Sequence, residues 1–325
     1  MSDFWSSARV LVTGGSGFLG QHVLARLRST GCQTVFAPRS YEVDLRDARA
    51  VTRMMESLRP TLVIHLAAVV GGIGANERRP AEFYYDNLLM GTHLLHESWR
   101  VGVSKFVGIG TVCAYPKFTP TPFREDDLWS GYPEETNAPY GLAKKMLSVQ
   151  GDAYRRQYGF TSIFLLPANL YGPGDNFDPA SSHVIPALIR KCVEARESGA
   201  HTIDVWGDGT PTRDFLYVGD AAEAIVLASE HYTDAAPVNI GSGQDISIAD
   251  LAGAIADAVG FTGAIVWDGT KPNGQPRRRL DTERAAAAFG FKASTDFARG
   301  LRDTVAWYLS HRNDRSSATA LDRIP

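Results

Sequence analysis

Tyr140 and Lys144 have the spacing in this sequence that most directly suggests chemistry. They belong to "YGLAK" in a stretch whose apolar residues recur at helical spacing, so both side chains are expected on one helix face. A tyrosine with its ordinary pKa near 10 transfers protons poorly at neutral pH until a neighbouring ammonium stabilises the phenolate. Lys144 can do this and can also hydrogen-bond a nicotinamide ribose. Taken alone, the spacing also fits an ordinary pair on a helix surface.

A hydroxyl and a thiol stand upstream in "GTVCAYPK", residues 110–117. Thr111 carries the hydroxyl needed to hold a carbonyl oxygen, and Cys113 follows it at the expected end of a strand. An isolated cysteine is usually a small buried apolar residue, and that interpretation is kept for Cys32 and Cys192. For Cys113 the neighbouring hydroxyl favours a thiol that does chemistry.

A glycine-rich turn opens the chain. In "VLVTGGSGFLGQHVLARL" the glycines Gly14, Gly17 and Gly20 lie between an apolar strand and a helix. Glycine allows the tight turn and the close approach of a diphosphate, whose charge is met by free N–H groups at the helix start. A purely structural turn is the alternative, but the strand before and the helix after favour a dinucleotide site.

The end of the second expected strand indicates which dinucleotide is bound. An acid there would hold a ribose 2′-hydroxyl, whereas a cation would favour a 2′-phosphate. Arg39 and Ser40 in "FAPRSYEVD" follow that strand directly and favour NADP. Asp44 is assigned to the adenine edge. The alternatives are that Arg39 is a solvated loop charge and that Asp44 or Asp47 is a helix cap.

These residues need a scaffold, and the first half of the sequence predicts one. Short β-branched runs alternate with longer amphipathic stretches, as in "RVLVTGG", "TLVIHLAA" and "KFVGIGT" with helical segments between them. Such alternation predicts a doubly wound α/β fold, with a parallel sheet covered by helices on both faces. Parallel strands end at one edge of the sheet, where the turn and the hydroxyls would meet.

The composition changes after residue 172, where "GPGDNFDPASSH" is rich in glycine, proline and aspartate. We therefore expect a nucleotide-binding domain and a second, smaller α/β domain, followed by a disordered polar tail. The expected ranges are 1–172 with 213–237 for the first domain, 173–212 with 238–312 for the second, and 313–325 for the tail.

Composition excludes several functional classes. The formal net charge of −3, with both signs spread along the chain, gives no footprint for nucleic acid. No apolar run approaches the roughly 18 residues that a membrane span needs. Three cysteines without CxxC spacing suggest neither a disulfide framework nor a metal site. We expect a soluble, cytoplasmic protein without a metal.

Taken together, these motifs resemble a known family. The turn "TGGSGFLG", "HLAA" at 65–68, "GT" at 110–111, the Tyr140–Lys144 pair and "PANLYGP" at 167–173 resemble the extended short-chain dehydrogenase/reductases. Longer segments are similar to one branch of that family, the GDP-L-fucose synthases, over about residues 8–310. They are "VGGIGANERRPAEFYYDN", "CAYPK", "NLYGPGDNFDPASSHVIPALIRK", "VWGDGTPTRDFLYV" and "KPNGQPRRRLD".

The resemblance implies a Rossmann domain, an NADP(H) cofactor and a GDP-bound 4-keto-6-deoxy sugar as substrate. It implies that Thr111, with Tyr140 and Lys144, supports hydride transfer to C4, although a serine is more usual than threonine at that position. It also implies that Cys113 and His183 are the base and the acid that invert C3 and C5, since a C4 ketone acidifies both neighbouring C–H groups. Without the resemblance, His183 could equally be a polar residue at a helix start.

The binding residues follow from the motifs and the resemblance together. Those expected to contact NADP(H) are Gly14, Gly15, Ser16, Gly17, Phe18, Leu19, Gly20, Arg39, Ser40, Asp44, Leu66, Ala67, Ala68, Tyr140, Lys144, Pro167, Asn169, Leu170 and His183. Those expected to contact the substrate are Asn169, Lys191, Trp206, Arg213 and Asn273, with Arg213 on the diphosphate and Lys271 in a basic loop nearby. Ordinary core packing is the alternative for Trp206.

Two other functions remain open on the sequence. One is an epimerase of a GDP-hexose or GDP-heptose that oxidises C4 only transiently, and the other is a cofactor-binding protein that has lost catalysis. The resemblance further implies a homodimer that packs two helices per subunit into a four-helix bundle. The candidate helices are "RPAEFYYDNLLMGTHLLHESWR" and "PYGLAKKMLSVQGDAYRRQYG".

Overall fold

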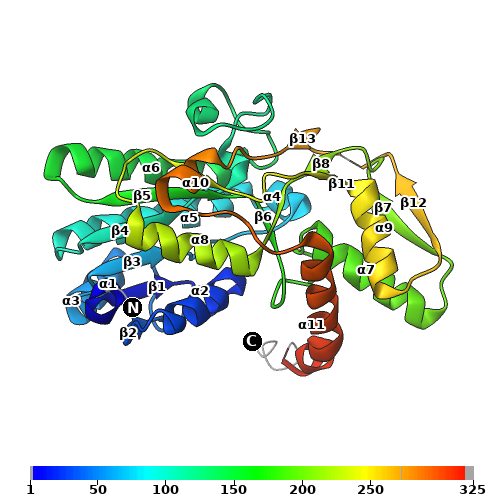
Figure 1. Ribbon diagram of the computed structural model, residues 1–325, viewed down its shortest axis with the longest axis horizontal. Coiled ribbons are helices and arrows are strands. Elements are labelled where there is room, and N and C mark those ends of the chain that lie inside the picture. Colours follow the sequence, from blue (N-terminus) through cyan, green and yellow to red (C-terminus); the bar gives the residue numbers. More distant parts are fainter. Residues whose placement is uncertain (1–2, 272, 319–325) are drawn as a thin grey trace.

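A six-stranded parallel sheet organises the larger part of the computed structural model, which describes residues 3–318 except 272 (Figure 1). The strand order is β10-β5-β4-β3-β1-β2, and every neighbouring pair is parallel. The expected doubly wound α/β fold is confirmed. The strands are β1 (Arg9–Thr13), β2 (Thr34–Phe36), β3 (Leu62–His65), β4 (Lys105–Ile109), β5 (Ser162–Pro167) and β10 (Val238–Ile240).

Helices cover both faces of this sheet. On one face α2 packs against α8, and on the other α5 packs against α3 and α6. All residues of β3 and β4 are buried, as expected for strands covered on both sides. The helices are α2 (Phe18–Ser29), α3 (Ala48–Leu58), α5 (Pro80–Arg100), α6 (Ala138–Tyr158) and α8 (Val218–His231).

Helix α6 brings the Tyr140–Lys144 pair to the strand ends. It starts at Ala138 with a proline in its first turn, and Gly159, whose φ of 69° favours glycine, caps its C-terminal end. Its first turns pack against the 3-10 turn η1 (Val112–Ala114), which follows β4. Tyr140 and Cys113 are therefore neighbours, although they lie on different elements.

The smaller part of the molecule has its own core. It gathers α7, α9 and α11 around two short sheets, and a pair of strands, β6 with β9, joins it to the larger part. Its helices are α7 (Val184–Ser198), α9 (Ile248–Val259) and α11 (Phe297–Ala318). Its strands are β7 (Thr202–Trp206) with β12 (Ala264–Asp268), and β8 (Thr212–Arg213) with β11 (Ile246–Ser247) and β13 (Arg277–Arg278), while the joining pair is β6 (Asn169–Tyr171) and β9 (Phe215–Tyr217).

Two expected boundaries differ from the structure. Residues 238–240 and α10 (Glu283–Phe289) were expected in the second domain, but β10 pairs with β5, and Ala285 and Phe289 belong to the core of the large sheet. A three-residue strand carries too little periodicity to show which sheet it joins. Residues 313–318 of the expected tail continue α11, and residues 319–325 lie outside the described residues.

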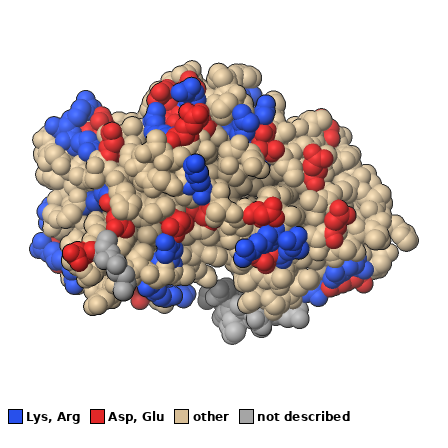
Figure 2. All heavy atoms as spheres, viewed as in Figure 1, with Lys and Arg blue, Asp and Glu red and all other residues tan. Residues whose placement is uncertain are grey.

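The N-terminal helix α1 (Asp3–Ser7) was not predicted. Trp5 is 2% exposed, and its Nε1 donates to Glu230 Oε2 of α8 at 2.6 Å. On the face drawn in Figure 2, basic and acidic side chains are interspersed. None of the helices in the described part of the chain is long and apolar enough to span a membrane.

Candidate active site

One large cavity lies between the carboxyl ends of the main strands and the smaller part of the molecule. Its volume is about 1160 Å³. It receives residues from the turns after β1, β3 and β4, from α6, and from the start of α7. The predicted residues that line it are Gly14, Ser16, Gly17, Phe18, Leu19, Gly20, Ser40, Asp44, Leu66, Ala67, Ala68, Thr111, Cys113, Tyr140, Lys144, Pro167, Asn169, Leu170, His183, Lys191, Trp206, Arg213 and Asn273.

The glycine turn fits a diphosphate. Gly14 has a φ of 73°, and a Cβ there would lie 2.7 Å from the Ala67 nitrogen, so the turn closes only with glycine. Gly17 is the N-cap residue of α2, and as a glycine it has no side chain to occupy the free N–H groups of the first turn. The first residues of α2 line the cavity. The helix start therefore offers backbone N–H groups and the positive end of its dipole to an anion. Gly15 does not line the cavity; a Cβ there would approach the Ala37 side chain at 2.8 Å.

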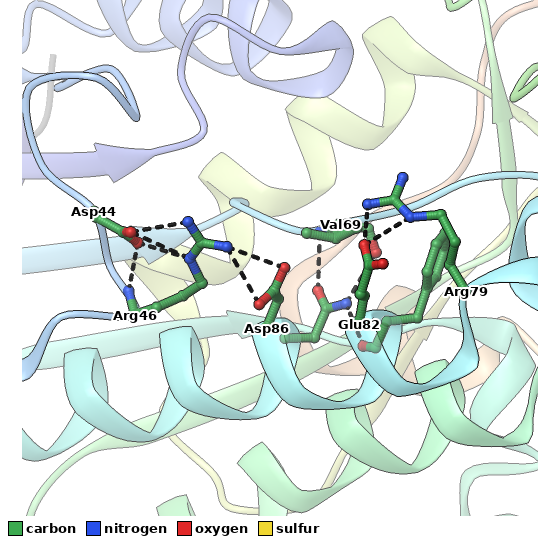
Figure 3. A network of polar contacts seen from close by, with 8 residues as sticks. Asp44, Arg46, Val69, Arg79, Glu82 and Asp86 are labelled. Carbon is green, nitrogen blue, oxygen red and sulfur yellow. Dashed lines mark hydrogen bonds and ion pairs between the residues drawn. The ribbon is translucent and has the colours of Figure 1, made fainter.

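A chain of ion pairs borders the end of the cavity near β2 (Figure 3). Arg46 lies between Asp44 and Asp86, with its Nη2 at 2.9 Å from Asp44 Oδ2 and its Nη1 at 3.4 Å from Asp86 Oδ2. The Arg46 guanidinium lowers the pKa of Asp44. Arg39, the cation expected from the sequence, is exposed and does not line the cavity, and its backbone N–H donates to Glu42.

Three groups suited to carbonyl chemistry meet where β4 ends against α6. Thr111 caps η1, with its Oγ1 accepting from the Cys113 N–H at 3.2 Å. Burial raises the pKa of Tyr140, the nearby Cys113 adds to this, and a hydrogen bond with Thr111 opposes it. Burial lowers the pKa of Lys144 to about 8. The residues expected to support hydride transfer are thus brought together.

Arg278 contacts Cys113, and this residue pair was not foreseen. Its Nη1 lies 3.5 Å from the Cys113 Sγ, and it is 7% exposed. Its Nε donates to Gln275 Oε1 at 2.7 Å, which holds the guanidinium in place. The Cys113 sulfur therefore has a buried, fixed cation as a hydrogen-bond donor beside it in the cavity. On the sequence alone, the arginines at 277–279 were interpreted only as part of a basic loop, although this run was the signal that could have pointed to Arg278.

His183 is the N-cap residue of α7, and its ring faces the cavity. Desolvation at this position lowers the pKa of the imidazole. No hydrogen-bond partner of the ring is found among the described residues. The position of His183 therefore depends on the backbone that precedes α7.

The predicted substrate residues surround the opposite end of the cavity. Arg213 donates to the backbone oxygens of Thr212 at 2.8 Å and Asn273 at 3.3 Å. Burial and the neighbouring Arg278 guanidinium lower the pKa of Arg213. Two cations that repel each other in a partly buried site would be stabilised by an anion such as a diphosphate.

One of the remaining substrate candidates has an exposed aromatic ring. Trp206 is 52% exposed, so core packing does not explain it, and Lys271 Nζ lies 5.6 Å from its ring centroid. Lys191 Nζ donates to the Asp204 backbone oxygen at 2.6 Å. Asn273 Oδ1 accepts from the Asp208 N–H at 3.0 Å, which ties the loop of residue 273 to the end of β7. No group of His, Cys, Asp or Glu suited to a metal ion occurs within residues 3–318 apart from 272.

Comparisons with known proteins point in the same direction. Residues 10–241 match the model of the NAD dependent epimerase/dehydratase family. The chain is 42% identical to a GDP-L-fucose synthase of Sinorhizobium fredii over 306 residues, which are 94% of this chain and 97% of the relative. It is 34% identical to a GDP-L-colitose synthase of Yersinia pseudotuberculosis, over 94% of this chain and 99% of that one.

A solved structure agrees with these sequence relatives. The fold matches a GDP-L-fucose synthetase from Naegleria fowleri bound to NADP, with a TM-score of 0.86 and 32% identity. The match covers 94% of this chain and 95% of that structure. Both the sequence and the whole architecture, including the smaller part, are therefore shared with enzymes of nucleotide sugars.

Proposed function

The chain belongs to the NAD dependent epimerase/dehydratase family, and we propose that it is an NADP(H)-dependent epimerase and reductase of a GDP-4-keto-6-deoxy sugar. The product of this reaction is GDP-L-fucose or a close analogue. The observation that carries the proposal is a single cavity containing an arginine-bound thiol, an imidazole and the Thr–Tyr–Lys set. This combination can both invert carbons next to a ketone and reduce the ketone itself.

The cofactor would bind along the larger part of the cavity. Its diphosphate would lie on the N-terminus of α2 beside Gly14 and Gly17, and the adenosine end would reach Ser40 and Arg46. Bound NADPH supplies the hydride. Lys144 would hydrogen-bond the nicotinamide ribose and so orient the cofactor next to Tyr140.

The substrate would enter with its charge directed to the arginines. Arg213 would bind the diphosphate as a planar cation, assisted by Lys191, and Trp206 offers an exposed ring on which a base can stack. Asn169 lines the cavity between the two halves and can hydrogen-bond the sugar. The preference for guanine is taken from the named relatives.

Inversion would use Cys113 and His183 together. With Arg278 donating a hydrogen bond to its sulfur, Cys113 would remove a proton next to the C4 ketone, and His183 would return one to the opposite face. Thr111 and Tyr140 would hold the enolate oxygen that forms on the substrate. Burial lowers the pKa of His183, which makes its protonated ring a stronger acid.

Reduction would follow at C4. Tyr140 would give its proton to the carbonyl oxygen as hydride reaches the carbon, and Thr111 would keep that oxygen in place. The nearby Lys144 ammonium would stabilise the phenolate that remains. The working thiol at Cys113 needs a reducing compartment, so a cytoplasmic location is part of the proposal.

The deciding experiment incubates the protein with GDP-4-keto-6-deoxy-mannose and NADPH and identifies the sugar by NMR. We expect stoichiometric loss of NADPH and a sugar inverted at C3 and C5. Inversion without net oxidation of NADPH would favour the epimerase alternative. If NADPH binds and neither change occurs, the catalytically silent alternative would be supported.

We also propose a homodimer through α5 and α6. Both helices carry large apolar side chains that are exposed in the single chain, among them Tyr85 at 60% and Val149 at 45%. A second copy would bury them, which is the usual reason for such a surface on a folded chain.

A further inference from the structure

The segment of residues 69–79, which contains α4 (Ile73–Arg78), leaves the main sheet after β3 and contacts both sides of the cavity. On one side Ala75 packs in a cluster with Phe83 and Tyr140, against which Cys113 also packs. The Phe83 and Tyr140 rings meet edge to face at 6.2 Å. One side of this segment is therefore fixed to the base and to the tyrosine.

The other side of the segment contacts the backbone that leads into His183. The Gly72 N–H donates to the Ser181 oxygen at 3.2 Å. A Cβ on Gly72 would lie 2.9 Å from the Ser182 oxygen, closer than a Cβ normally approaches, so only glycine lets the two segments meet. Arg78 Nη2 donates to the Ala180 oxygen at 3.0 Å. These contacts reach three consecutive residues that precede His183.

Two buried amides hold the segment itself. Asn76 is 2% exposed, and its Nδ2 donates to the oxygens of Gly71 at 2.8 Å and Gly72 at 3.1 Å. Asn87 of α5 donates to the Val69 oxygen at 2.9 Å and accepts from the Val69 N–H at 3.1 Å. The glycine turn at 71–72 is thus fixed before it reaches residues 181–182.

The same segment also reaches the substrate end of the cavity. A Cβ built on Gly74 would lie 4.0 Å from the Trp206 ring, and one on Gly274 would lie 3.5 Å from Ile73 Cδ1. The segment therefore lies beside residues that are far from it along the chain. The segment also packs against Tyr140 through Ala75, so its role in inversion has to be measured separately from reduction.

Inversion makes the stricter geometric demand. The acid and the base must lie on opposite faces of one sugar, and an error of about 1 Å can cost about a hundredfold in rate. We propose that Asn76, Gly72 and Arg78 are positioning residues that hold residues 180–182 and thereby set His183 opposite Cys113. The proposal rests on the proposed function, and it assigns inversion, and not reduction, to this segment.

The test is the ratio of inverted to non-inverted reduced sugar, measured by NMR after incubation with GDP-4-keto-6-deoxy-mannose and NADPH. Asn76→Ala, Gly72→Ala and Arg78→Ala are compared with the parent protein, and Arg79→Ala is the control. Arg79 is the next residue, but it is exposed and pairs with Glu82, 2.7 Å from its Nε, and not with residues 180–182.

We expect the share of inverted product to fall by about tenfold in Asn76→Ala and Gly72→Ala, and less in Arg78→Ala, because the Arg78 contact is exposed. Direct reduction should persist, Arg79→Ala should match the parent, and Arg78→Lys should restore part of the ratio. A general loss of stability would slow both reactions and leave the ratio unchanged.

An unchanged ratio in folded Asn76→Ala and Arg78→Ala overturns the proposal. If Asn76→Ala or Gly72→Ala does not fold, as judged by circular dichroism, the product ratios of Arg78→Ala and Arg78→Lys decide, because Arg78 is exposed. If the parent protein itself makes no inverted sugar, the proposed function fails first and this inference falls with it. The parent measurement therefore separates the two failures.

Discussion

At the residue scale, Cys113 shows how a single contact changes the meaning of a side chain. Cys32 and Cys192 are buried, and burial raises the pKa of both thiols, to about 11 for Cys192. Cys113 instead lines the cavity and receives a hydrogen bond from a buried arginine. A thiol reagent at neutral pH is therefore expected to react first with Cys113.

Replacing Cys113 by serine or His183 by glutamine should abolish inversion and leave some C4 reduction. Removal of a general base or acid typically costs about a hundredfold or more in the step that it serves. The measurement is deuterium incorporation at C3 and C5 in D₂O, with NADPH oxidation followed in the same sample. Exchange at the parent rate in either variant would refute the acid and base assignment.

The burial of Lys144 predicts how the free energy of unfolding depends on pH. Burial lowers its pKa from the ordinary 10.5 to about 8. Between these values the unfolded chain binds more protons than the folded one, so the free energy of unfolding rises with pH, and below pH 8 the full cost of burying the charge remains.

Lys144→Met removes that cost. We expect the cofactor-free variant to be more stable than the parent at pH 7, by up to roughly 3 kcal/mol, and the difference to shrink as the pH rises through 8 to 10. Urea unfolding over this pH range measures it, with the exposed Lys292→Met as control. A lower stability of Lys144→Met at pH 7 would contradict this account.

Arg46 and Arg39 can be distinguished by cofactor preference. Both arginines are exposed, but Arg46 lines the cavity between two carboxylates, whereas Arg39 does not line it. Arg46→Ala should weaken NADPH binding by about tenfold and change NADH binding little, because a charged hydrogen bond to a 2′-phosphate is worth about 1.5 kcal/mol or more. Titration of both cofactors into both alanine variants tests this. If only Arg39→Ala loses the preference, the expectation from the sequence was right.

At the element scale, α5 and α6 serve both the sheet and the expected dimer. Their inner faces cover the sheet, and α6 carries Tyr140 and Lys144 into the cavity. Their outer faces hold stacked aromatic rings, such as Trp99 and Tyr158 at 4.2 Å, as well as Val149. Because each of these helices must pack on the sheet and also form the proposed dimer interface, few of its positions can be substituted freely.

Val149→Glu should shift the protein toward the monomer, because a carboxylate would be buried without a partner in the proposed interface. Val266→Glu on β12 is a matched control, since both valines are 45% exposed. Mass measurement by analytical ultracentrifugation compares them. A parent protein that is already monomeric, or an unchanged mass in Val149→Glu, would refute this interface.

At the scale of the whole molecule, Asp214 joins the two parts. It lies between β8 and β9, and its carboxylate accepts from the Ser242 Oγ at 2.7 Å, the Ser242 N–H at 3.0 Å and the Leu280 N–H at 3.3 Å. The residue is 1% exposed. Segments far apart in the sequence therefore meet at one carboxylate, next in the chain to Arg213, the residue proposed to bind the diphosphate.

Asp214→Ala should lower the free energy of unfolding by about 3 kcal/mol or more, because it leaves several buried donors without an acceptor. It should also weaken binding of GDP, since Arg213 is the next residue. Urea unfolding and GDP titration test both effects. Asp250→Ala, which removes an exposed carboxylate at the start of α9, is the control and should cost far less.

Local patterns in the sequence were enough to predict the glycine turn, the Tyr140–Lys144 spacing, the doubly wound sheet and the presence of a second part. The reason is that backbone freedom, helical periodicity and strand composition depend on residues near in the chain. Nearly all of the predicted site residues line one cavity, and Arg39 and Gly15 are the exceptions.

Only the tertiary structure decided which distant residues complete the site. Arg278 is 165 residues from Cys113, Arg46 reaches Asp86 of α5, and Gly72 donates a hydrogen bond to Ser181 in the cavity wall. The short strand β10 joined the main sheet for the same reason. These contacts carry no local signal, because they arise from the packing of whole elements, and a sequence pattern records only the neighbours along the chain.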